Sequence, residues 1–117
     1  MTRAERLEKW TALVAESANL VRDYCVAFAG DACAAPAQFA IRLASVRGQV
    51  NALSVRSCPV GSAWDAAADF LAVVRMFADQ ASPPALRLQL IDRVTVTAER
   101  LRHALTEGDR ALADIDG

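Results

Sequence analysis

Apolar side chains recur at alternating three- and four-residue steps in four separate segments of the chain. In the first segment the stripe comprises Leu7, Trp10, Val14, Ser17, Val21, Tyr24 and Phe28. This spacing keeps to one side of a helix with 3.6 residues per turn. Thr2, with Glu5 three residues later, indicates a capping box, and Gly30 suits the helix end. The pattern predicts one long amphipathic helix at the start of the chain.

Two shorter helices are predicted next, on either side of a turn at 57–61. Pro36 is a favoured first helical residue. The stripe that follows it comprises Phe39, Leu43, Val46, Val50 and Leu53. Gly48 lies inside this helix, so either the helix is weaker there or a neighbouring helix approaches closely.

The helix after the turn is expected to be capped by Ser62, with Asp65 at the box position. Its stripe comprises Ala67, Phe70, Leu71, Val74, Phe77 and Ala81. Trp64, Val73 and Met76 carry apolar surface further around its circumference, which is typical of a helix buried on several sides.

Ser82-Pro83-Pro84 both ends this helix and starts a fourth. The last stripe comprises Ile91, Val94, Ala98, Leu101, Leu105, Leu112 and Ile115. The β-branched run at 94–97 has local strand propensity, but it lies inside the helical pattern and is expected to be helical. Gly108 either lies within this helix or ends it.

Four amphipathic helices with short connections predict an all-α fold, an antiparallel up-down four-helix bundle. Its 117 residues are enough for one domain with a modest core, so residues 1–117 are expected to form a single bundle domain. Thirteen basic and fourteen acidic side chains give a net charge of −1, which offers no electrostatic reason to expect nucleic acid or a membrane surface.

The N-terminal stretch is charged, and no stretch approaches the roughly 18 apolar residues of a membrane span. Three cysteines without a CxxC pair do not suggest a disulfide framework. Cys25 is expected to be a small buried residue, and Cys33 and Cys58 to be free in loops. A cytoplasmic location is therefore expected, and the Arg- and Ala-rich composition hints at a bacterial source.

The single histidine, His103, is the one candidate for chemistry. It lies two positions from Leu101, about 200° around the helix, so it is expected to be exposed. Histidine phosphotransfer domains carry a hydrophobic residue, a lysine and a glycine at the second, third and fourth positions after their histidine. Here Leu105 fits, but Thr106 and Glu107 do not. Phosphotransfer through His103 is therefore the alternative function, not the leading one.

No cofactor or metal site is predicted. A di-iron bundle needs two Glu-x-x-His pairs, whereas Glu99 precedes the only histidine by four residues. A zinc site would need more converging sulfur or imidazole ligands. A pocket for a small apolar ligand, lined by Phe39, Phe70 and Phe77, is a further possibility.

Apolar surface beyond what four helices need to cover is the remaining feature. Five side chains are candidates for an interface: Trp10, Trp64, Val73, Met76 and Val96. Trp10 and Trp64 would lie at the same end of the bundle, near the Cys58-Pro59 turn, where they either plug the core or, if partly exposed, form a binding patch. Contiguous exposed apolar surface usually marks an interface. The sequence therefore predicts a non-enzymatic protein–protein interaction module, such as an adaptor, chaperone-like or regulatory protein, that binds itself or another protein.

Overall fold

The computed structural model describes residues 2–29, 36–79 and 83–116. Its elements are α1 (Arg3–Ala29), α2 (Pro36–Ala52), two 3₁₀ turns (η1, Val55–Ser57; η2, Gly61–Ala63), α3 (Trp64–Ala78) and α4 (Pro84–Asp116). No strand occurs in these described ranges, so the predicted all-α fold is confirmed. The run at 94–97 is helical, as expected.

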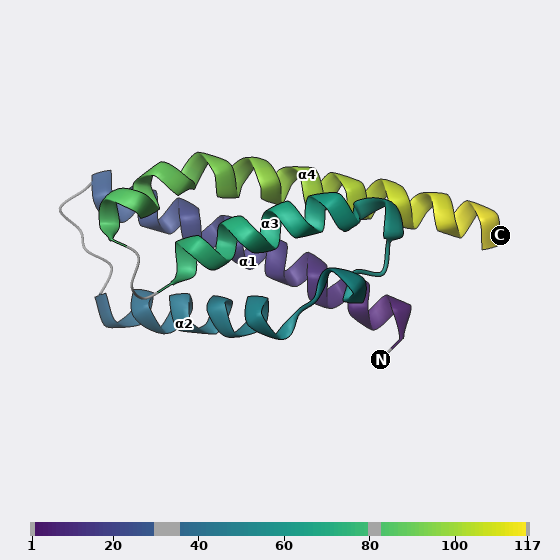
Figure 1. Ribbon diagram of the computed structural model, residues 1–117, viewed down its shortest axis with the longest axis horizontal. Helices are drawn as coiled ribbons and strands as arrows, with labels where there is room; N and C mark the ends of the chain where they lie inside the picture. The colour runs from purple at the N-terminus through teal and green to yellow at the C-terminus, as the bar shows by residue number, and fades with distance from the viewer. Residues whose placement is uncertain (1, 30–35, 80–82, 117) are drawn as a thin grey trace.

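The four helices lie along one long axis, and each runs opposite to the one before it (Figure 1). The molecule measures 52 × 23 × 20 Å. At about 1.5 Å per residue, the 33-residue α4 spans about 50 Å, the whole length of the molecule. α2 and α3 are each about half as long as α4. The segment 53–63, which connects them and contains the two 3₁₀ turns, therefore covers the end of α1 and α4 that neither helix reaches.

The core forms where the four stripes meet. Its largest fully buried side chains include Trp10, Leu13, Leu20, Val46, Val50, Phe70, Phe77, Leu90, Leu101 and Leu105. α3 packs against both α4 and α2, and this explains why more than half of its side chains are buried, as its wide apolar circumference predicts. Ser17 is buried within the α1 stripe, and its hydroxyl has no hydrogen-bond partner among the described residues.

The predicted helix starts are partly correct. Thr2 Oγ1 accepts a hydrogen bond from the Glu5 backbone N–H at 3.1 Å, and α2 begins at Pro36. Ser62, however, does not cap α3, which makes no side-chain cap hydrogen bond. Instead η2 leads directly into the helix, and the Trp64 backbone N–H donates to the Gly61 carbonyl. Gly30 and Ala81 lie outside the described residues.

The two helical glycines have opposite surroundings. A Cβ on Gly48 would have no atom of the other described elements within 4 Å, so none of the described helices approaches closely there. A Cβ on Gly108 would overlap Val60 Cγ1 and lie 3.3 Å from Ser62 Oγ. α4 continues through Gly108 to Asp116, and the close approach of 53–63 to α4 takes place at this glycine.

Aromatic rings pack together near the other end of the bundle. The Tyr24 ring lies 5.1 Å from the Phe39 ring and 5.6 Å, edge to face, from the Phe77 ring. Burial raises the pKa of the Tyr24 hydroxyl. Phe70 and Phe77 are almost completely buried, so the rings of these two phenylalanines are part of the hydrophobic core.

Candidate interface on the outer side of α4

The structure divides the five interface candidates into two groups. Trp10 is 0% exposed, so it plugs that end of the core, which is the first of the two outcomes expected for it. Val73 is 4% exposed, so the expectation that it adds surplus apolar surface is wrong. Segment 53–63 covers Trp10, and the packing of α3 against α4 covers Val73. Trp64, Met76 and Val96 are 41%, 44% and 56% exposed, and they remain candidates for an interface.

Both tryptophans lie against the turn near Cys58, as the bundle topology predicts. The Trp10 indole N–H donates to Ser57 Oγ, and the Trp64 indole N–H donates to the Cys58 carbonyl, each at 3.3 Å. Their indole rings therefore fix 53–63 to α1 and α3. Both indole N–H groups are thus satisfied within the subunit, while Trp64 remains 41% exposed.

A groove runs along the outside of the molecule between α3 and α4. It is lined by Asp69, Ala72, Val73, Asp92, Arg93, Val96, Thr97 and Arg100. Arg100 Nη1 lies 3.6 Å from Asp69 Oδ2, and both side chains are about 60% exposed. Asp92 makes no ion pair within the described part of the chain. Apolar side chains thus occupy the middle of the groove and charges lie around them.

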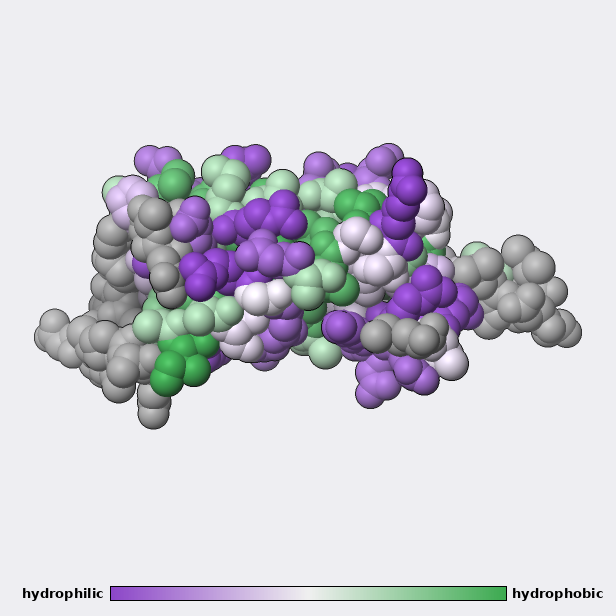
Figure 2. Space-filling model, turned by 60° about the horizontal axis from the view of Figure 1, so that its bottom comes forward, coloured by the Kyte–Doolittle hydropathy of each residue, from purple (hydrophilic) through white to green (hydrophobic). Residues whose placement is uncertain are grey.

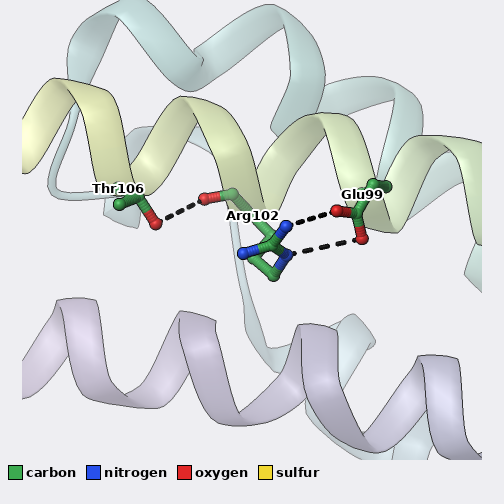
Figure 3. Close-up of polar contacts among 3 residues, drawn as sticks. All are labelled: Glu99, Arg102 and Thr106. Atoms are coloured by element: carbon green, nitrogen blue, oxygen red, sulfur yellow. Dashed lines mark hydrogen bonds and ion pairs between the residues drawn. The ribbon is translucent and has the colours of Figure 1, made fainter.

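His103 is exposed on α4, as predicted, in a second shallow hollow that also contains Val96, Glu99 and Arg100. Val96 therefore borders both hollows. Glu99 accepts two hydrogen bonds from the Arg102 guanidinium (Figure 3). These bonds and the charge of Arg102 lower the pKa of the Glu99 carboxyl.

A third groove separates α4 from α1. Small side chains of α1, among them Ala15 and Ala18, face Ile91, Thr95 and Ala98 of α4 across it. Cys25 lines the same groove and is half-buried. Cys58, by contrast, is fully buried and its thiol donates to the Val60 carbonyl, and burial raises its pKa.

The expectations for the cysteines were thus partly wrong. Cys58 is free but buried, because 53–63 packs inward, and Cys25 is only half-buried. Cys33 lies outside the described residues.

Sequence periodicity missed two exposed apolar side chains. Ile41 of α2 and Leu88 of α4 are 69% and 43% exposed, and neither belongs to a core stripe. Figure 2 shows the side of the molecule that carries α2, where hydrophobic areas are separated by hydrophilic ones. A plot of the polar side of each helix, rather than of its core stripe, would have marked both residues.

Across the ranges 2–29, 36–79 and 83–116, no three His, Cys, Asp or Glu side chains are grouped as metal ligands would be. Within the same ranges, no helix is both long enough and apolar enough to cross a bilayer. Comparison with protein families, curated proteins and solved structures finds no match for this chain. Functional inference therefore depends on the chemistry of the surface.

Proposed function

We propose that this protein is a non-enzymatic interaction module that works by binding another protein chain, and that its leading partner is a second copy of itself. The observation that carries the proposal is the exposure of Val96 on the outer side of α4, at the border of two hollows. Because Val96 is 56% exposed, burial of its remaining surface contributes at most about half of the roughly 1.5–3 kcal/mol gained when such a side chain is fully buried. Adaptor, chaperone-like and regulatory roles all fit this behaviour.

The chemical groups of the chain support binding rather than catalysis. The Cys58 thiol is buried and bonded to a backbone carbonyl, and Cys25 lies in the groove between α1 and α4, whereas His103 lies in the hollow beside Val96. No thiol–imidazole pair is formed by the described residues. The free thiols of Cys25 and Cys58 fit a reducing compartment such as the cytoplasm.

Light scattering from micromolar up to millimolar concentrations tests the proposal. We expect a mass above that of the monomer, and we expect Val96→Glu to lower it towards the monomer. Ile41→Glu is the matched control, because Ile41 is even more exposed but lies on α2; it should leave the mass unchanged. A wild-type protein that remains monomeric at every concentration would refute self-association.

Phosphotransfer through His103 is the second candidate. It is favoured by one observation, the exposure of His103 in a hollow that also holds the cationic Arg100. Glu99 in the same hollow opposes it by repelling phosphate. Incubation with a cognate kinase decides this point: acid-labile phosphate that disappears in His103→Ala supports the role, and equal labelling of the variant eliminates it.

A further inference from the structure

Residues at four-residue steps along α4 form a row with an ordered chemistry, which winds about 40° around the helix at each step and crosses its outer side at Asp92, Val96 and Arg100. The row is Leu88, Asp92, Val96, Arg100 and Ala104. Its members alternate between apolar and charged: apolar, acidic, apolar, basic, apolar. Leu88 and Val96 are 43% and 56% exposed, Asp92 and Arg100 are exposed, and Ala104 is half-buried. We call this set the 88–104 row.

The 88–104 row is complementary to its own reverse. If a second copy of the row is laid alongside it in the opposite direction, with Val96 against Val96, the acid of each copy meets the base of the other. Each four-residue step advances about 6 Å along the helix, so both charged pairs lie about 6 Å from the centre. Leu88 and Ala104 lie about 80° around the helix on either side of Val96, so the contact is centred on Val96 and the two charged pairs.

We propose that two copies of this protein pair through their α4 helices, antiparallel, with a two-fold axis at Val96. This inference rests on the proposed function and specifies its geometry. Packing of four-residue ridges against one another is the commonest way that two helices cross in globular proteins. A two-fold interface uses the same patch on both subunits, which is the property that the 88–104 row has.

The surroundings of the row fit this pairing. Asp92 has no ion pair within the described residues, so its carboxylate is available. Arg100 already lies 3.6 Å from Asp69, so in the dimer it would lie between two carboxylates, one from each subunit. A single helix crossing is small beside the roughly 1,600 Å² of a standard interface. We therefore expect a weak dimer, with a dissociation constant in the micromolar range or above.

Two charge-reversed variants test the geometry. In Asp92→Arg each charged contact of the dimer becomes Arg against Arg, and in Arg100→Asp each becomes Asp against Asp. Replacing two attractions by two repulsions should raise the dissociation constant at least about tenfold for either variant alone. A one-to-one mixture restores both contacts, because the basic chain and the acidic chain complement each other, and the mixture should dimerise about as well as the wild type.

Sedimentation equilibrium of each variant and of the mixture measures these constants. Circular dichroism verifies folding, which the loss of the exposed Asp69–Arg100 pair should hardly affect. Ile41→Ser, a change of apolar surface outside the row, should dimerise like the wild type. If the wild type dimerises and the charge-reversed variants do so equally, or if the mixture stays monomeric, the pairing is wrong although self-association stands. A monomeric wild type refutes self-association itself, and the pairing with it.

Discussion

Replacement of Gly108 by alanine tests the close approach of segment 53–63 to α4. Within a helix, alanine is more favourable than glycine by about 1 kcal/mol. No glycine in the described residues has a positive φ, so the backbone accepts alanine at Gly48 and at Gly108. Gly48→Ala adds a methyl group that contacts nothing, and it should stabilise the protein by about 0.5–1 kcal/mol.

Gly108→Ala should instead lower the free energy of unfolding. The new methyl group would overlap Val60 Cγ1 and lie 3.3 Å from Val60 Cβ. Val60 is 2% exposed and β-branched, so it has little room to rotate away. Overpacking of this kind costs about 1–3 kcal/mol, which outweighs the helical gain. We expect Gly108→Ala to destabilise the protein by about 1–2 kcal/mol.

A double-mutant cycle isolates this contact. Val60→Ala alone should cost about 2 kcal/mol, because it removes two buried carbons. In that background the methyl at Gly108 has space, so Gly108→Ala should stabilise by up to about 1 kcal/mol. The coupling between the two sites is then roughly 2–3 kcal/mol. Urea unfolding followed by circular dichroism measures all four proteins, and equal stabilisation by Gly48→Ala and Gly108→Ala would refute the close approach.

Three further changes have defined outcomes. Ser17→Ala should raise the urea midpoint, because it removes a buried hydroxyl without a partner and favours the helix; a lower midpoint would contradict the burial of that group. Trp10→Phe should destabilise the protein more than Trp64→Phe in thermal unfolding, because Trp10 is 0% and Trp64 41% exposed; equal losses would contradict this. Hydrogen bonds and charge from Arg102 lower the pKa of the Glu99 carboxyl in the folded protein. The pair therefore stabilises the fold at pH values above the pKa that this carboxyl has in the unfolded chain. This contribution is lost as the pH falls through the lower pKa of the folded state. In Arg102→Met, carboxyl titration by NMR should show the Glu99 pKa rising to its ordinary value, and an unchanged pKa would refute the assignment.

Features that depend on residues close together in the sequence could be predicted from the pattern of apolar and polar positions. The four stripes follow helical periodicity, so the helices and most core residues could be read directly, as Val94, Leu101 and Leu105 illustrate. The exposure of His103 follows from its angle to Leu101. The predicted start of α3 was wrong. Serine is a favoured N-cap residue, but Ser62 lies inside the 3₁₀ turn η2, which continues directly into α3 without a side-chain cap.

The candidate interface was only half predictable. Val96 could be recognised because it lies opposite the core stripe of its own helix. Trp10 and Val73 could not be assigned in this way, because their burial depends on what packs against them. Leu88 lies outside the core stripe of α4, so the periodicity of core residues does not mark it.

Helical periodicity and short connections act between near neighbours along the chain, so the order of residues is enough to predict the helices, their faces and the ends at which Trp10 and Trp64 lie. The tertiary structure alone decided which apolar side chains stay exposed, because exposure depends on the lengths of the packed elements. α2 and α3 are shorter than α1 and α4, so 53–63 folds inward over Trp10 and against Gly108, while the outer side of α4 is left uncovered along Leu88 and Val96.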